Sequence, residues 1–419
     1  MQKDNYKITE RTPIMQKKHQ SFIWFILLAF FVFHGVLENT LPIVNFFDEF
    51  IGLCCIPFAA YDLYRKHKDG TGFTSGSRRW EFVLLLLFLV TGLLANVIYK
   101  YQPLWIVAIS AVLSTKFFMI LLTAGYLQRY MPVDFQELEL SVEIISITWA
   151  VYYGLTFIFP DFLTIPEGWD ICAKSSLLFA LLIFCRHRRV WLYRVCLFLM
   201  VAMLVMCGKE KAYGAILVFA VLYYLIVHKK VQTKLRYILY MAVPVVLLAW
   251  DKIYYYYVEG HGYYAKSIMA STSMQIAKDY FPIGTGFGTF GSTYAAKWYS
   301  PVYYLYGIAA DHQMGEQSRM YLTDVFWPLL LGENGILGTL LYCGLILILF
   351  IRIQRVFYYD KTKYFLLIFL LVFMMMTTFS EAGFMQPMVM IYAFVMGALL
   401  EEYEGKREQK MKYFRQREK

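Results

Sequence analysis

The sequence predicts an all-α, polytopic membrane protein with about 12 transmembrane helices and one large extracytoplasmic loop that contains short interfacial helices. Composition gives the first indication: 59% of the 419 residues are hydrophobic and the mean hydropathy is +0.49, whereas soluble domains are about half apolar. Several apolar runs are also long enough to cross most or all of a bilayer. Examples are Phe22–Leu37, Phe82–Ile98 and Leu104–Leu122.

Each predicted span follows from a run of apolar residues bounded by polar ones. The twelve spans are residues 22–40, 44–63, 80–99, 103–127, 140–159, 171–185, 190–207, 212–227, 235–250, 330–351, 364–382 and 386–401. We expect residues 1–419 to form a single integral membrane domain. Residues 251–329 form the large loop between spans nine and ten, and residues 402–419 form a basic cytoplasmic tail.

The loop charges predict the orientation of the chain. With the N-terminus in the cytoplasm, the inner segments and the inner ends of the spans contain 30 Lys and Arg residues, the outer segments contain 8, and 2 lie elsewhere within spans. Cytoplasmic loops of membrane proteins carry such an excess of positive charge. Both termini are therefore expected in the cytoplasm.

The loop contains the stretch Phe281–Ser292, FPIGTGFGTFGS, which matches G-x-G-x-x-G. A dinucleotide site needs this pattern between a strand and a helix in a βαβ unit, and neither the helical context nor an extracytoplasmic position fits. The glycines still allow positive φ and exposed amide groups that bind anions. We expect them to cradle a phosphate that arrives from outside or within the outer leaflet.

The sequence gives no support for nucleic-acid binding, metal binding or acyl-enzyme chemistry. The net charge of +10 is explained by the cytoplasmic loops, so no nucleic acid partner is expected. The seven cysteines lie in or beside apolar runs without metal-site spacing and are expected to be core residues. The outer loops contain no H-E-x-x-H, D-x-D or G-x-S-x-G motif. Neither a metal nor a cofactor nor an acyl-enzyme is therefore expected.

Three lysines on the outer side are exceptions to the charge rule. Lys209 and Lys211 lie in the tight turn GKEKAYG, which suits an anion site for a lipid pyrophosphate; the alternative is a pair solvated by water and headgroups and neutralised by Glu210. Lys266 begins an amphipathic loop helix that runs into the glycine-rich stretch. It either provides a second cation in a cleft or is merely exposed.

The segment Ser318–Gly338 predicts a short helix that dips at the interface before span ten. Asp324 fits a helix N-cap, and its alternative role is a carboxylate that orients or activates the acceptor. Glu333 lies at the other end, in the turn Gly-Glu-Asn-Gly. A carboxylate next to the membrane needs a partner.

Four further ionisable residues lie within spans or at their outer ends: Asp48, Glu49, Lys116 and Glu381. Ionisable groups at membrane depth usually face a cavity or a partner. We expect Lys116 to form a structural ion pair with one of the acids.

Three strings resemble a known family: IAKDYFPIGTGFGTFGS, YSPVYYLYGI and DVFWPLLLGENGILG. With about twelve spans and a large outer loop late in the chain, they resemble the O-antigen ligase and polymerase superfamily of bacterial envelope glycan enzymes, and its polymerase-type members in particular. The resemblance covers about Cys207–Cys343, and the rest of the chain matches only in hydropathy.

The resemblance implies a polymerase in the bacterial plasma (inner) membrane. Such an enzyme transfers a lipid-linked oligosaccharide from undecaprenyl pyrophosphate to a sugar hydroxyl on the outer face, without a nucleotide sugar. Its implied partners are undecaprenyl-pyrophosphate-linked oligosaccharides and membrane lipids, together with a chain-length regulator and a flippase. Direct attack without a covalent intermediate implies inversion at the anomeric carbon.

The resemblance also implies roles for particular residues. Ligase-type members carry an arginine in the turn before the eighth span, an arginine early in the loop helix, and a histidine about nine residues before the acid of an E-x-G turn. This chain has Lys209 and Lys211 at the first place, Lys266 at the second and Asp324 at the third. The cations are kept and the histidine is absent, which favours a polymerase over a ligase.

In the implied site the three lysines hold the pyrophosphate and stabilise the charge that develops on it. Asp324 accepts a hydrogen bond from the attacking hydroxyl, and Glu333 is the further acid of the site. The residues expected to complete pyrophosphate binding and to shape the sugar groove are Gly284, Gly286, Gly288, Gly291, Tyr294, Arg319 and Trp327.

A lipid-linked oligosaccharide flippase is the main alternative from another class, since transporters also have about twelve spans. Transporters place charged sites near the midplane and are often built from internal repeats. In this chain the polar features concentrate in one outer loop, and the sequence shows no repeat.

Overall fold

The computed structural model describes residues 14–41, 44, 46–68, 76–186, 188–233, 254, 264–319, 321–379 and 381–417. Every regular element within these ranges is a helix, which confirms the predicted all-α class. The first half of the chain forms α1 (Ile14–Thr40), α2 (Phe47–Leu53), α3 (Cys55–Lys68), α4 (Gly76–Tyr99), α5 (Leu104–Tyr130), α6 (Glu139–Ile158), α7 (Gly168–Phe184), α8 (Val190–Met206) and α9 (Glu210–Leu222), which continues into the π-helix η3 (Tyr223–His228).

The described residues from 264 onward form three shorter helices and then three longer ones. They are α12 (Ala265–Asp279), α13 (Thr293–Lys297), α14 (Pro301–Leu305), α15 (Trp327–Val356), α16 (Lys361–Thr377) and α17 (Met390–Arg417). Short 3-10 turns occur at η2 (Phe135–Glu137), η5 (Ile308–Ala310), η6 (Gly383–Met385) and η7 (Pro387–Val389).

Six of the described helical segments are long and apolar enough to cross a membrane: Lys18–Glu38, Trp80–Tyr99, Leu104–Tyr130, Glu139–Ile158, Glu210–His228 and Trp327–Val356. This number supports a polytopic membrane protein but does not confirm the expected twelve spans. Predicted span two is divided between α2 and α3. Spans six and eleven correspond to α7 and α16, each of 17 residues. Span nine, residues 235–250, lies outside the described residues.

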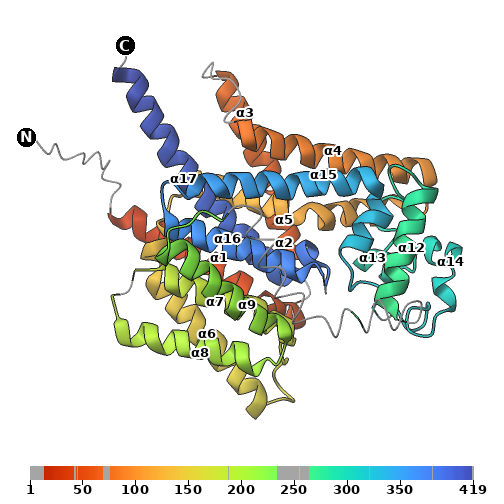
Figure 1. The fold of residues 1–419 in the computed structure, drawn as a ribbon, viewed down its shortest axis with the longest axis horizontal. Helices are drawn as coiled ribbons and strands as arrows, with labels where there is room; N and C mark the ends of the chain where they lie inside the picture. The colour runs from red at the N-terminus through yellow and green to blue at the C-terminus, as the bar shows by residue number, and fades with distance from the viewer. Residues whose placement is uncertain are drawn as a thin grey trace, which may run out of the picture.

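Helices α2, α3, α4 and α17 pack against α5, and α6, α7, α8 and α9 pack together in the other part of the bundle (Figure 1). Within the most apolar window of α5, 78% of the residues are buried, and α17 crosses it closely. A Cβ atom at Gly397 would lie 2.1 Å from the carbonyl oxygen of Leu121, so only glycine permits this contact. Helix α1 begins and α17 ends at the same end of the bundle (Figure 1), as expected if both termini lie on one side of a membrane.

The described part of the loop folds at the opposite end of the bundle. There α12, α13 and α14 lie beside the ends of α4 and α15 (Figure 1). These short elements share a small hydrophobic core of their own, which includes Met269, Phe290, Tyr303, Met314 and Leu322. The described residues of the loop therefore form a packed cap on the bundle.

Buried and half-buried ion pairs join the helices at the end away from the loop. Arg129 of α5 binds Asp62 of α3 and Glu401 of α17 at 3.0 and 2.9 Å. Arg352 of α15 binds Glu81 of α4 and Glu404 of α17. Each arginine thus links three helices, so part of the positive charge counted on the predicted cytoplasmic side stabilises the fold.

Replacing Arg352 with alanine is expected to lower the free energy of unfolding by about 3–5 kcal/mol, because Glu81 and Glu404 would keep their charges without a cation. The side chain of Arg352 is 3% exposed. Denaturant unfolding in detergent measures the effect, and Arg194→Ala, an exposed arginine of α8, is the control. Equal stability of the two variants would contradict the prediction.

Candidate functional site

An ion pair connects the first turn of α9 to the segment after α16. The ammonium of Lys211 lies 2.6 Å from Oε1 of Glu381, and the two side chains are 19% and 22% exposed. Lys211 also stands over the ring of Trp169, with its nitrogen 5.0 Å from the ring centre. The lysine is thus half-buried and fixed by two partners, unlike a freely solvated surface lysine.

Asp324 lies close to this ion pair. Its side chain is half-buried, and burial is the largest cause of its raised pKa. The charge of Glu381 raises this pKa further, whereas the charges of Lys266 and Lys211 lower it. These four groups, which we call the Asp324 cluster, therefore lie close enough to interact. They come from α12, the segment before α15, the start of α9 and the end of α16.

The structure thus brings together three of the residues selected from the sequence: Lys211, Lys266 and Asp324. The sequence did not indicate that Glu381 is the partner of Lys211. The two residues are 170 positions apart, and no local pattern predicts a contact over that separation. Lys209 lies nearby but differs in its surroundings. It is exposed, and its side chain runs along the backbone at Gly168, where a Cβ atom would lie 2.7 Å from Cε of the lysine.

The glycine-rich stretch does bind an anion, but the anion is a side chain of the same protein. The amide groups of Thr289 and Phe290 donate to Oε1 of Glu333 at 2.9 and 3.1 Å, and the Ser292 hydroxyl donates to the same oxygen at 2.6 Å. Glu333 is fully buried. The predicted phosphate cradle is therefore occupied by an internal carboxylate.

Further amide groups of the stretch also have partners within the protein. Thr285 and Gly286 donate to the carbonyl oxygens of Gly332 and Glu333 at 3.0 and 2.7 Å. Phe287 donates to Oδ1 of Asn96 at 2.8 Å, and Nδ2 of Asn96 donates back to the Phe287 carbonyl at 3.0 Å. A lone asparagine in an apolar span is the sequence signal for this clamp.

The four predicted glycines serve this packing. Gly284, Gly286, Gly288 and Gly291 are buried and have φ values of 72°, 96°, 77° and 73°. A Cβ atom at Gly284 would lie 2.4 Å from the Gly335 amide nitrogen. Positive φ and close approach explain these glycines. They and Glu333 shape the loop from within, and these contacts give no support to the expectation that they contact substrate.

The start of α15 differs in one respect from the prediction. Phe326, not Asp324, is the N-cap residue, and no side chain caps the helix. Asp324 therefore does not use its carboxylate as a cap. The expected break after a short helix is present, because Gly335 interrupts α15 with φ 61° and ψ −167°. Trp327 holds the start of α15 against the end of α16, since its Nε1 donates to Oγ1 of Thr378 at 3.1 Å.

Arg319 lies apart from the Asp324 cluster in its contacts. Its guanidinium donates to the carbonyl oxygens of Glu316 and Lys297 and stands over the ring of Tyr299, 5.7 Å from the ring centre. It therefore supports the fold of the loop, and these contacts give no support to its expected role in pyrophosphate binding.

The expected pair at Lys116 is present, with both neighbouring acids. The Lys116 ammonium lies 2.7 Å from Oδ2 of Asp48 and 3.1 Å from Oε1 of Glu49. Tyr294 of α13 lies close by. Burial is the largest cause of its raised pKa, and the charges of Glu49 and Lys116 also act on it.

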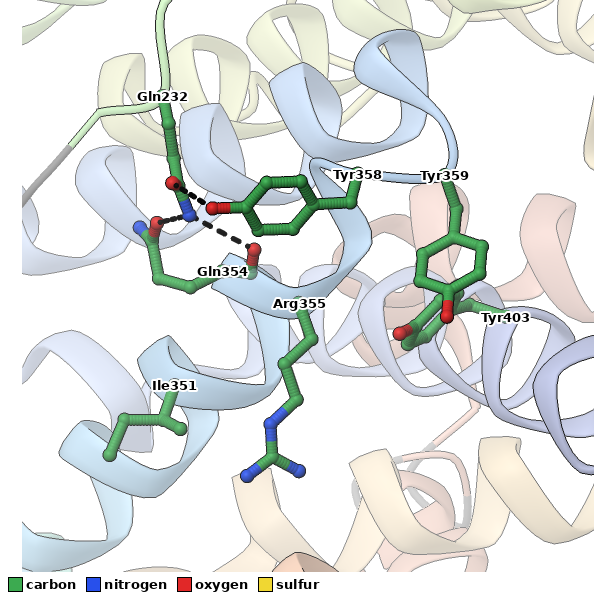
Figure 2. A pocket seen from close by; sticks show the side chains of 7 residues that line it. All are labelled: Gln232, Ile351, Gln354, Arg355, Tyr358, Tyr359 and Tyr403. Atoms are coloured by element: carbon green, nitrogen blue, oxygen red, sulfur yellow. Dashed lines mark hydrogen bonds between the residues drawn. The ribbon is translucent and has the colours of Figure 1, made fainter.

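A pocket of about 550 Å³ lies at the far end of α15. Figure 2 shows its lining of Gln232, Ile351, Gln354, Arg355, Tyr358, Tyr359 and Tyr403. Nε2 of Gln232 donates to Oε1 of Gln354 at 2.9 Å, and Tyr358 donates to Gln232 at 3.1 Å. About 24 residues of α15, roughly 36 Å of helix, separate this pocket from the Asp324 cluster. The pocket is therefore not part of the same site as the cluster.

The chain matches no protein-family model, and no curated protein is significantly similar to it. Fold and site together define a helical membrane protein with a half-buried cluster of two lysines and two acids beside a folded loop. Any more specific function has to be argued from these residues.

Proposed function

We propose that this protein is a polymerase of lipid-linked oligosaccharide repeat units, acting at the outer face of the plasma membrane of a bacterium. The observation that carries the proposal is the convergence of Lys211, Lys266 and Asp324 from three distant segments. Two cations beside a carboxylate at a membrane surface suit the transfer of a glycan from a polyprenyl pyrophosphate.

The lysines bind the donor in this proposal. Lysine is a point charge that binds phosphate without the bidentate geometry of arginine. Lys211 is paired with Glu381, so the incoming pyrophosphate competes with this carboxylate. Lys209, exposed on the same turn, adds charge at the entrance. As the bond between the anomeric carbon and the pyrophosphate oxygen breaks, the lysines stabilise the negative charge on the leaving group.

Asp324 acts on the acceptor. Its carboxylate accepts the proton of the attacking sugar hydroxyl while the hydroxyl oxygen bonds to the anomeric carbon. The products are the elongated glycan and the polyprenyl pyrophosphate. The attack is direct, so the configuration at the anomeric carbon is inverted.

The test uses surface glycans of cells that lack the protein, or that carry Lys211→Ala. The matched control is Lys278→Ala, an exposed lysine in the last turn of the same loop helix as Lys266. Loss of long chains, with single repeat units accumulating, is the expected result for both the deletion and Lys211→Ala. Long chains stranded on the carrier lipid would indicate a ligase. Repeat units trapped on the cytoplasmic leaflet would indicate a flippase.

The pH dependence of transfer tests the role of Asp324. The pKa of Asp324 is raised by burial and then by the charge of Glu381. A general base works only while it is ionised. Transfer is therefore expected to be lost, as the pH falls, at a higher pH than for an aspartate with an ordinary pKa. Glu381→Gln removes a raising charge and shifts this acid limb to lower pH. Lys266→Ala removes a lowering charge and shifts it to higher pH. Rate profiles of purified protein measure both shifts, and identical limbs would exclude Asp324 as the titrating group.

A further inference from the structure

Two cysteine side chains meet between α7 and α8, close to the Asp324 cluster. Cys172 lies in the second turn of α7 and is fully buried, whereas Cys207 is the C-cap residue of α8 and is half-buried. The side chains of the two residues are in hydrogen-bond contact. Both are free thiols in the structure, and neither takes part in the proposed transfer reaction.

The packing of α7 against α8 brings this pair together. Near the start of α7, a Cβ atom at Gly168 would lie 3.4 Å from the carbonyl oxygen of Cys207. Deeper in the interface, Oγ of Ser175 donates to the sulfur of Met203 at 4.0 Å. Residues 168, 172 and 175 share one face of α7. Cys172 therefore lies between these two contacts and opposite the last turn of α8.

The thiol of Cys207 is directed into the same interface. It donates to the carbonyl oxygen of Leu204 at 3.1 Å, which turns the sulfur back along α8, toward the level of Cys172. The next residue, Gly208, has φ 63°, and no atom of the described residues lies within 4 Å of a Cβ atom built on it. The chain thus has room to shift here while the two sulfur atoms approach to the about 2 Å of a disulfide bond.

We propose that Cys172 and Cys207 form a reversible disulfide bond that ties the chain between α8 and α9 to α7. Disulfide bonds form and persist outside the cytoplasm, and this turn lies on the expected outer face. The oxidant is a small-molecule or protein disulfide, which reacts by thiol–disulfide exchange.

The exchange proceeds in two steps. The more exposed thiol, Cys207, loses its proton and attacks one sulfur of the oxidant, whose other sulfur leaves as a thiolate. The thiolate of Cys172 then attacks the Cys207 sulfur and displaces the second thiolate of the oxidant. The two thiol protons pass to the two leaving thiolates, and two electrons pass from the cysteines to the oxidant.

The bond would constrain the chain that presents the outer lysines. Lys209 and Lys211 follow Cys207 by two and four residues. Lys211 stands over the ring of Trp169, three residues before Cys172. A cross-link at the base of this turn opposes its local opening, on which cleavage by a protease depends. Trypsin should therefore cut the folded protein more slowly after Lys209, which is exposed.

The competing explanation is that the two thiols are only core residues, as the sequence analysis expected for all seven cysteines. Structural cysteines buried in a core are inert. A core pair would stay reduced while the protein is folded, whereas the proposed pair is oxidised without unfolding.

The experiment exposes the folded full-length protein in detergent to oxidised glutathione, then unfolds it, alkylates the remaining thiols and maps tryptic peptides by mass spectrometry. Trypsin separates Cys172, in peptide 130–174, from Cys207, in peptide 195–209. The variants are Cys172→Ala and Cys207→Ala. The matched control is Cys196→Ala, which removes the other thiol of peptide 195–209, a buried one in α8.

We expect the two peptides to be cross-linked in the wild type and in Cys196→Ala, and the cross-link to be lost in Cys172→Ala and Cys207→Ala. Oxidation should also slow cleavage of the folded wild type after Lys209 several-fold, and a reducing agent should restore it.

Three outcomes would overturn the inference: both thiols alkylated after oxidation, a glutathione adduct on Cys207 alone, or a bond between Cys207 and Cys196. A cross-link that leaves cleavage after Lys209 unchanged would reject the constraint on the turn. None of these measurements depends on glycan transfer, so the result is independent of the proposed function.

Discussion

Replacing Asp324 with asparagine is expected to slow glycan transfer by about 10²–10⁴-fold, because asparagine cannot accept the proton of the attacking hydroxyl. The change is nearly isosteric and removes no helix cap, since Phe326 occupies the N-cap position without a side-chain bond. Stability should therefore stay close to wild type. Transfer from the lipid-linked donor by purified protein measures the rate.

Thr323→Val is the matched control, because it changes the neighbouring half-buried side chain without touching a carboxylate. Transfer by Asp324→Asn at the wild-type rate would remove this aspartate from the mechanism. The lysines and the proposed donor site would then need another base.

Replacing Glu333 with alanine is expected to lower the free energy of unfolding by about 3–5 kcal/mol. The variant leaves three buried donors, the amides of Thr289 and Phe290 and the hydroxyl of Ser292, without their acceptor, and each such group costs about 1–3 kcal/mol. The expected sum is lower than three full penalties because the loop relaxes. Unfolding in detergent measures the loss, and limited proteolysis of residues 281–300 detects loosening of the loop.

Glu333→Gln is the comparison, because it keeps one carbonyl oxygen for the same donors and should be clearly milder. A stable alanine variant with lost transfer would reverse the assignment, since it would place Glu333 in the chemistry and not in the packing of the loop.

The sequence predicted the helical class and the membrane character because hydropathy depends on composition along the chain. It did not establish how many helices are long enough to cross a membrane. Predicted span two is divided at Cys54, between α2 and α3, and apolar residues on both sides hide this break in the hydropathy. Buried elements such as α16 are apolar for packing reasons as well, so hydropathy alone cannot separate a core helix from a span.

For the site, the sequence analysis selected residues that are unusual for their position. Lysines on an outer face and acids at span ends carry energetic penalties that require partners, and Lys116 has the expected acids. Which charged side chains pair with each other depends on the tertiary structure. Lys211 binds Glu381, 170 residues away, and Glu333 fills the turn formed by the glycine-rich stretch more than 40 residues earlier. No local pattern encodes these pairings.

The contacts of the glycine-rich stretch also determine when the loop can fold. Phe287 is clamped by Asn96, 191 residues earlier in α4, while Thr289 and Phe290 need Glu333, more than 40 residues later in α15. Contacts between residues so far apart form late, because closing a long segment of chain costs entropy before any contact compensates for it. Ordering of the loop must therefore await synthesis and insertion of α15, and a nascent chain that ends before Glu333 should expose residues 281–300 to protease even when α4 is already in place.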